Sequence, residues 1–198
     1  MTYYTLSDPC AATLEIKKSQ FLGFGIAIDS REQLMFHVEQ LRNQYPDARH
    51  VCYGYIIGDP HNTTSAGFDD DGEPSGTAGR PILNVLQHKG IGNCVVIVVR
   101  YFGGIKLGAG GLTRAYSSTA QAVVDNMNLH AFVPLSVILI ETDFANESFV
   151  RHTLDGFKAT ILQVDYGKNV VLTVEAAQKS VQALSEKIGF YGNLKASE

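Results

Sequence analysis

The sequence predicts an α+β protein made of two domains, residues 1–132 and 133–198. The chain has 198 residues, more than the roughly 100–150 of a typical single domain. Strand-like and helix-like patterns of apolar residues alternate along its whole length. Pro134 interrupts an apolar segment where a second, shorter series of these patterns begins. Together these observations favour a larger domain followed by a smaller one.

The first domain is expected to begin with extended chain followed by a helix. Residues 13–29, TLEIKKSQFLGFGIAID, alternate only in part, which fits either one bent strand or a hairpin. Ser30 and Gln33 then match a capping box, and apolar residues recur at helical spacing from Leu34 to Tyr45. The helix cannot continue through Pro46, which lacks a backbone N–H and clashes with the preceding turn.

A strand over residues 51–58 leads into DDDGEPSGTAGRP, Asp69 to Pro81, and then a short helix over residues 81–90. The carboxylates of Asp69–Asp71 and Glu73 could hold magnesium or calcium. Their spacing does not match an EF-hand, and adjacent acids point in different directions. A structured loop that helps to cap the following helix is therefore favoured, and neither a metal nor a cofactor is expected.

A strand, a glycine loop and a long helix are expected next. Residues 94–102, CVVIVVRYF, are apolar on both faces as far as Arg100, which is typical of a central buried strand. The turn GGIKLGAGG, residues 103–111, precedes a helix from about Leu112 to Leu129. Such a unit can present backbone N–H groups and the positive end of a helix dipole to an anion.

The glycine loop does not match the Walker template, which needs Gly-Lys-Ser/Thr after four residues. It also fails GxGxxG, because position 113 is Thr. Arg100, Lys106 and Arg114 nevertheless surround the start of the helix and could bind phosphate. The alternative is a tight crossover, in which glycines let helix and sheet approach and Arg100 caps a strand end or pairs with Asp69–Asp71. For a glycine loop taken alone, this alternative is favoured.

The second domain is expected to follow a strand, helix, strand, strand, helix, strand order, the split βαβ or ferredoxin-like plan. The predicted elements are a strand after Pro134, a helix at 146–157, strands at 159–166 and 170–175, a helix carrying Ala177, Val181, Leu184 and Ile188, and a strand at 193–196. Its exposed positions hold no cluster of His, Cys or paired acids, so the plan alone names no chemistry.

Composition limits the classes of function. The 45% hydrophobic and 18% charged residues indicate a globular protein, and a formal charge of −4 gives no global case for nucleic acid, so only a local basic patch could bind it. No DNA sequence readout is expected. No signal peptide or membrane span is predicted, and three cysteines far apart in sequence fit reducing cytoplasm.

Cys52 follows Arg49 and His50, and a Cys and His pair can form a nucleophile. Cys52 and Cys94 lie in apolar strands, however, and are expected to be small core residues. His50 is expected in the same cleft as Arg100. Hydrolase signatures such as GxSxG and HExxH are absent from the sequence, so no catalytic residue is assigned.

The segments EIKKSQF, DARHVCYGYIIG, GFDDDGEPSGTAGRPIL and VVIVVRYFGGIKLGAGGLTRAY resemble the signature blocks of the IMPACT family, in its bacterial two-domain form. The resemblance covers essentially the whole chain. It implies an N-terminal domain like that shared by a small-subunit ribosomal protein, domain four of elongation factor G and a family of small-molecule kinases. It also implies a C-terminal domain like the ferredoxin-like last domain of the same elongation factor.

Eukaryotic members of that family dampen an amino-acid-starvation kinase, so the resemblance implies a general link to translation. The expected function is that of a non-enzymatic cytoplasmic regulator that binds ribosome, structured RNA or a translation protein. The alternative is a binder or enzyme of a phosphorylated small molecule that uses the glycine loop. The residues expected to form the binding cleft are Arg49, His50, Asp70, Asp71, Glu73, Arg100, Tyr101, Lys106, Gly108, Gly110, Gly111 and Arg114.

Overall fold

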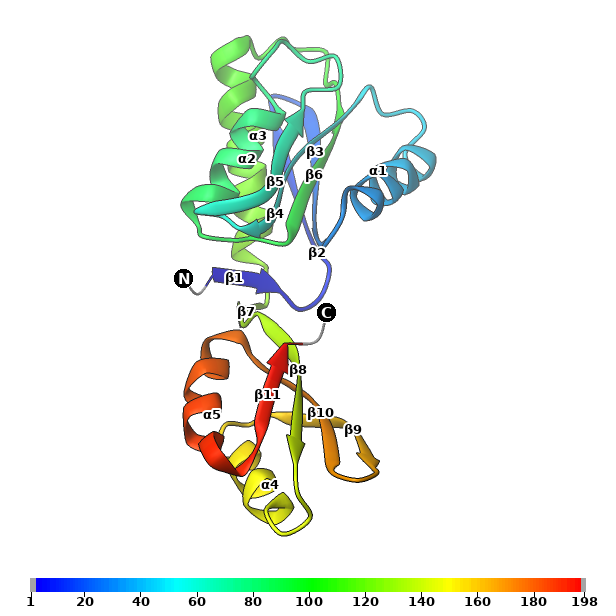
Figure 1. Ribbon diagram of the computed structural model, residues 1–198. Helices are drawn as coiled ribbons and strands as arrows, with labels where there is room; N and C mark the ends of the chain where they lie inside the picture. The colour runs from blue at the N-terminus through cyan, green and yellow to red at the C-terminus, as the bar shows by residue number, and fades with distance from the viewer. Residues whose placement is uncertain (1–2, 197–198) are drawn as a thin grey trace. The chain divides into compact units, whose positions relative to one another are not determined.

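The computed structural model describes residues 3–196, and the chain divides into two compact units, Met1–Phe132 and Val133–Glu198 (Figure 1). Each unit contains helices and antiparallel sheet, so the protein is α+β as the sequence predicts. The elements of the first unit are β1 (Tyr3–Leu6), β2 (Cys10–Ile16), β3 (Ser19–Ala27), α1 (Arg31–Gln44), β4 (His50–Asp59), β5 (Asn62–Asp69), α2 (Gly79–His88), β6 (Cys94–Tyr101), α3 (Ala109–Asp125) and β7 (Leu129–Phe132).

The first unit has three layers. Its five-stranded antiparallel sheet has the order β2-β3-β6-β4-β5, and α1 covers one face while α2 and α3 cover the other (Figure 1). β6 is the central strand, and its residues from Cys94 to Val99 are completely buried. The prediction of a central buried strand is therefore confirmed. A separate two-stranded sheet pairs β1 with β7.

Local signals explain where the first elements begin and end. Lys17 and Lys18 both have positive φ, which closes a tight turn between β2 and β3, so the open choice between a bent strand and a hairpin resolves as a hairpin. At the start of α1, Ser30 Oγ accepts a hydrogen bond from Gln33 N, and Gln33 Oε1 accepts one from Asp29 N. The predicted cap is confirmed, with the reciprocal bond displaced by one residue.

The first unit differs from the sequence prediction at several elements. β1 and β7 were not predicted. β5 was not predicted, because this edge strand is polar and largely exposed and so shows no apolar alternation. α3 begins at Ala109 and ends at Asp125, whereas the apolar stripe suggested residues 112–129. The small residues of its first turn carry no apolar signal, although the helix includes them.

The second unit contains β8 (Leu135–Thr142), α4 (Glu147–Gly156), β9 (Thr160–Tyr166), β10 (Val170–Ala177), α5 (Val181–Ile188) and β11 (Asn193–Ala196), with short 3₁₀ turns before and after α5. Its antiparallel sheet has the order β11-β8-β10-β9, and both helices pack on one core with β8 and β10. Ala177 ends β10 and is not helical, which corrects its predicted place. No helix of residues 3–196 is long and apolar enough to cross a membrane.

Candidate anion-binding pocket

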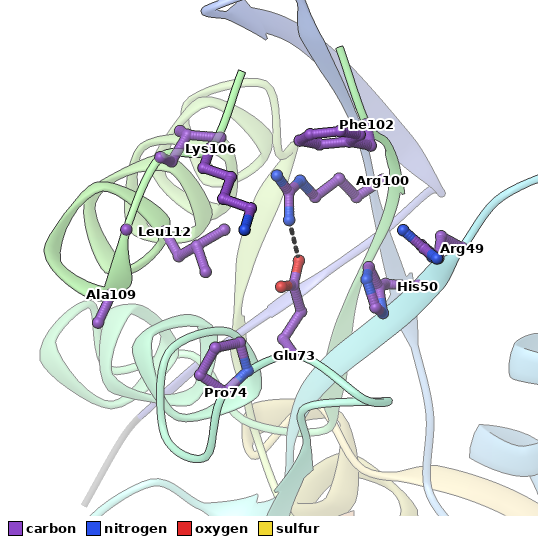
Figure 2. A pocket seen from close by; sticks show the side chains of 11 residues that line it. Arg49, His50, Glu73, Pro74, Arg100, Phe102, Lys106, Ala109 and Leu112 are labelled. Atoms are coloured by element: carbon purple, nitrogen blue, oxygen red, sulfur yellow. Dashed lines mark hydrogen bonds and ion pairs between the residues drawn. The ribbon is translucent and has the colours of Figure 1, made fainter. Parts of the chain in front are cut away.

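A cavity of about 330 Å³ opens on the first unit where five segments meet (Figure 2). These are the start of β4, the acid loop (residues 70–78), the end of β6, the loop before α3 and the first turn of α3. Because α3 begins at Ala109, the name glycine loop is used from here on for residues 102–108. The lining residues are Arg49, His50, Glu73, Pro74, Arg100, Phe102, Lys106, Leu107, Gly108, Ala109 and Leu112. Segments far apart in sequence thus contribute cations and apolar groups to one hollow.

The acid loop is shaped by its own carboxylates. Asp70 accepts hydrogen bonds from the backbone N–H groups of Gly76 at 2.6 Å, Ala78 at 3.0 Å and Gly79 at 2.9 Å. The last two N–H groups belong to the N-terminal end of α2, where unpaired donors need an acceptor. The prediction of a structured loop that helps to cap this helix is confirmed.

Asp71 ties the loop to β4 and α1. Its carboxylate accepts from Val51 N at 2.7 Å and from Arg42 Nη2 at 2.9 Å, and its backbone oxygen lies 2.7 Å from His50 Nδ1. Because a carbonyl oxygen only accepts, His50 Nδ1 must carry the proton. In the neutral ring, Nε2 is then an acceptor. Asp71 therefore fixes the orientation of a side chain that lines the pocket.

Glu73 and Arg100 form a buried ion pair in the wall of the pocket, drawn as a dashed line in Figure 2. Glu73 Oε1 accepts from Arg100 Nη1 at 2.5 Å and from Tyr116 OH at 2.8 Å, and the Arg100 and Glu73 side chains are 6% and 4% exposed. The sequence alternative paired Arg100 with Asp69–Asp71. The structure corrects this, because Asp69 and Asp70 accept from backbone N–H groups and Asp71 accepts from Val51 N and Arg42. Among the described residues, the carboxylate that pairs with the guanidinium is that of Glu73.

Cys52 is fully buried and contacts Tyr116, the second hydrogen-bond donor to Glu73. Its single S–H can donate to the backbone oxygen of Asp70, at 3.0 Å, or to Tyr116 OH, at 3.4 Å. Burial raises the pKa of Cys52 well above its ordinary value, and burial likewise raises the pKa of Tyr116. Both groups are therefore neutral hydrogen-bond donors, and Cys52 is a core residue as predicted.

The Arg100 guanidinium lies close to two aromatic rings, 5.4 Å from the Phe21 centroid and 5.8 Å from that of Phe102. Its Nε is buried and finds no hydrogen-bond partner within residues 3–196. A buried polar nitrogen without a partner is costly and calls for an explanation. Arg100 is thus a partly satisfied cation on the wall of the pocket.

The glycine loop passes unusually close to the β2–β3 turn. A Cβ at Gly103 would lie 2.0 Å from the backbone of Lys18, so no other residue fits there. The Gly103 N–H donates to the buried Ser19 Oγ at 3.1 Å. Lys106, exposed on this loop, points its amine toward the space beside Arg100 (Figure 2).

α3 begins at the pocket with unpaired backbone donors. Gly108 precedes it at φ 72° and ψ 166°, a conformation essentially confined to glycine, and the first backbone hydrogen bond runs from Leu112 N to Gly108 O. The N–H groups of residues 109–111 therefore lack helical partners, and the first turn contains no acidic residue. The N-terminal half-charge of the helix dipole adds to the positive potential of the pocket.

The pocket carries an excess of positive charge. Glu73 neutralises Arg100, whereas Arg49 and Lys106 make no ion pair with any residue of the described chain. Two cations and a helix N-terminus therefore remain without a counter-charge. This arrangement can bind an anion such as phosphate.

Six of the residues expected in the cleft line the pocket, namely Arg49, His50, Glu73, Arg100, Lys106 and Gly108. The other six are not among its lining residues. Asp70 and Asp71 hold the acid loop, Gly110 and Gly111 lie in the first turn of α3, Arg114 is exposed, and Tyr101 packs with the α1 side of the sheet. The lining residues that the sequence did not suggest are Pro74, Phe102, Leu107, Ala109 and Leu112.

The chain is similar in sequence and in structure to known proteins. The Impact N-terminal domain matches residues 17–124, and a domain of unknown function (DUF1949) matches residues 140–189. The chain is 34% identical to the IMPACT family member YigZ of Escherichia coli over 91% of this chain and 88% of that one. A crystal structure of a hypothetical protein superposes at TM-score 0.73 and 32% identity, covering 100% and 98% of the two chains.

The structure of the two-domain translational regulator Yih1 is more distant. It matches 63% of this chain and 47% of that one, at 25% identity and TM-score 0.36. The Impact N-terminal match covers more than half of the chain, and the similarity to YigZ extends over nearly all of it. The protein is therefore a member of the IMPACT family.

Proposed function

We propose that this protein is a non-enzymatic, cytoplasmic regulator associated with translation, and that it binds RNA through the pocket of its first unit. One observation carries the proposal. A protein with a formal charge of −4 keeps Arg49, Lys106 and the start of α3 unneutralised around one hollow. Phosphate groups are what such a local cluster binds, whatever the net charge of the whole chain.

Membership of the IMPACT family supports the link to translation. Yih1, which shares 25% identity with the matched part of this chain, is described as a translational regulator. We further propose that the first unit has the fold shared by a small-subunit ribosomal protein and domain four of elongation factor G. For the second unit, the β11-β8-β10-β9 order with two helices on one core supports the ferredoxin-like plan.

Co-sedimentation with ribosomes from the protein's own host, at two salt concentrations and with or without nuclease, tests the proposal. Lys106→Ala is expected to weaken RNA binding and to reduce the slope of log affinity against log salt by about one unit. Lys89→Ala is the matched control, because Lys89 is exposed on the same unit outside the pocket. Protein that stays at the top of the gradient in low salt would rule out stable ribosome binding.

A second candidate function is the binding or conversion of a phosphorylated small molecule. The cavity of about 330 Å³ favours it, because that volume lies at the small end of the usual range of small-ligand pockets, about 300–1,000 Å³. A thermal-shift screen with phosphorylated metabolites separates the two. A ligand at one hundred times its dissociation constant should stabilise the protein by about 2.7 kcal/mol, whereas a flat screen argues against this function.

A further inference from the structure

We infer that the pocket holds the phosphorylated end of a single-stranded RNA, with the terminal base stacked on Phe102. This inference rests on the proposed RNA binding and deepens it by naming the part of the RNA that is bound. It follows from three properties of the pocket: its charge, its one exposed aromatic ring and its size.

The charge of the pocket matches a phosphate monoester better than a phosphodiester. A terminal phosphate carries about −1.5 to −2 at neutral pH and offers three acceptor oxygens, whereas an internal linkage carries a single negative charge. Arg49 and Lys106 supply two unpaired positive charges, and the α3 N-terminus adds about half a charge. One internal phosphate would leave much of this charge unmatched.

Arg100 contributes donors from the wall of the pocket. A guanidinium has five N–H groups; Glu73 engages Nη1, and the buried Nε has no partner within residues 3–196, so the hydrogen-bonding capacity of Arg100 is only partly used. The nearby N–H groups of residues 109–111 are likewise free of helical partners. The site therefore offers several fixed donors to one multi-oxygen anion.

Phe102 offers a stacking surface at the rim. Its ring lies flat over the Arg100 guanidinium in Figure 2, with 5.8 Å between the guanidinium carbon and the ring centroid, and the residue is 46% exposed. One face of the ring is thus supported by a buried cation while the residue stays accessible. Bases stack on such rings with little regard to sequence, which suits the end of a single strand.

The volume of the pocket argues against a duplex. About 330 Å³ accommodates a ligand of nucleotide size, and apolar side chains of Pro74, Leu107 and Leu112 form part of its walls. A duplex would place the sugar and phosphate groups of both strands against these apolar walls. A splayed single-stranded end inserts one phosphate and leaves its base at Phe102.

Fluorescence anisotropy with three short RNAs of one sequence tests the inference. The three carry a 5′-phosphate, a 3′-phosphate or hydroxyls at both ends, with the dye placed internally. One phosphorylated end should bind about ten- to a hundredfold more tightly than the hydroxyl form, as expected for hydrogen bonds to a charged group. Lys106→Ala should reduce this preference, and Lys89→Ala should retain it.

Phe102→Leu separates stacking from phosphate binding. It should weaken binding of the preferred RNA about fivefold or more, yet leave unchanged the binding of the same RNA with an abasic end. Circular dichroism of each variant checks that the unit remains folded. An equal loss for both RNAs would overturn the stacking role of Phe102.

The two proposals fail in different ways. RNA binding that depends on Lys106 but ignores terminal phosphates would overturn the end recognition and leave the proposed function intact. Absence of binding to all three RNAs would remove both. Binding of a nucleoside monophosphate as tight as that of the phosphorylated RNA would overturn RNA-end recognition in favour of a small-molecule ligand.

Discussion

The two loops that line the pocket are held in place by opposite means. The carboxylates of the acid loop are engaged in hydrogen bonds within the first unit. Asp70 accepts from three backbone N–H groups, Asp71 accepts from Val51 and Arg42, and Glu73 accepts from Arg100. The glycine loop is fixed by one close backbone approach at Gly103, and its other side chains are largely exposed.

The charges that stand out in the sequence, the carboxylates of the acid loop, therefore have a structural role. Four carboxylates in five residues suggest a binding site, yet those of Asp70, Asp71 and Glu73 are occupied by hydrogen bonds within the unit. Among the described residues that line the pocket, the cations without an ion pair are Lys106 of the glycine loop and Arg49 at the start of β4. Substitutions of the acid-loop carboxylates should therefore change stability, and substitutions of the exposed side chains of the glycine loop should change binding.

The largest effect is expected from Glu73→Gln. The amide keeps the shape of the side chain but leaves the Arg100 guanidinium buried without a counter-charge, which should lower the free energy of unfolding by about 3–5 kcal/mol. Urea denaturation followed by circular dichroism, with hydrogen exchange of the β6 amides to assign the loss to the first unit, measures it. Glu15→Gln, at an exposed position of β2, should change little. An unchanged β6 protection would mean that Arg100 does not depend on this carboxylate.

A smaller loss is expected from Asp70→Asn. The amide nitrogen would face one of the three N–H donors that the carboxylate now satisfies, and the charge at the α2 N-terminus would disappear. The expected cost is about 2 kcal/mol, measured in the same denaturation experiment. Asp47→Asn, at an exposed position before β4, is the control. Equal stability of both variants would contradict a structural role for the acid loop.

The smallest effect on stability is expected from Lys106→Ala. Its side chain is exposed and makes no ion pair within the described chain, so the free energy of unfolding should change by less than about 0.5 kcal/mol. The same variant should lose RNA affinity in the salt titration described above. A decrease of several kcal/mol in the free energy of unfolding would show that Lys106 stabilises the fold as the acid-loop carboxylates do, and would contradict the distinction between the two loops.

Much of the fold could be read from the sequence because apolar periodicity marks elements that face a core. The central strand and α1 were predicted for this reason. β5 was missed because an exposed edge strand has no buried face to impose alternation. Ala177 was placed on a helix because its spacing to Val181 is helical, although it ends β10.

The pocket was harder to predict because its partners meet only through tertiary structure. Strand alternation already implies that Arg100 and Tyr101 face opposite sides of the sheet, and this signal could have excluded Tyr101. The buried stripe containing Leu112 and Tyr116 similarly places Arg114 outside the core-facing side of α3. No local pattern, in contrast, indicates that Glu73 rather than a neighbouring acid would reach Arg100.

The shared hydrogen bonds of Glu73 also have a consequence for folding kinetics. Glu73 and Arg100 are 27 positions apart in the sequence, and Glu73 and Tyr116 are 43 positions apart. The hydrogen bond between Cys52 and Tyr116 spans 64 positions. Contacts of such sequence separation form only after long stretches of chain have been ordered, and they slow folding. During synthesis, a nascent chain that has not yet emerged as far as α3 would lack Tyr116, so the pocket would be completed among the last parts of the first unit.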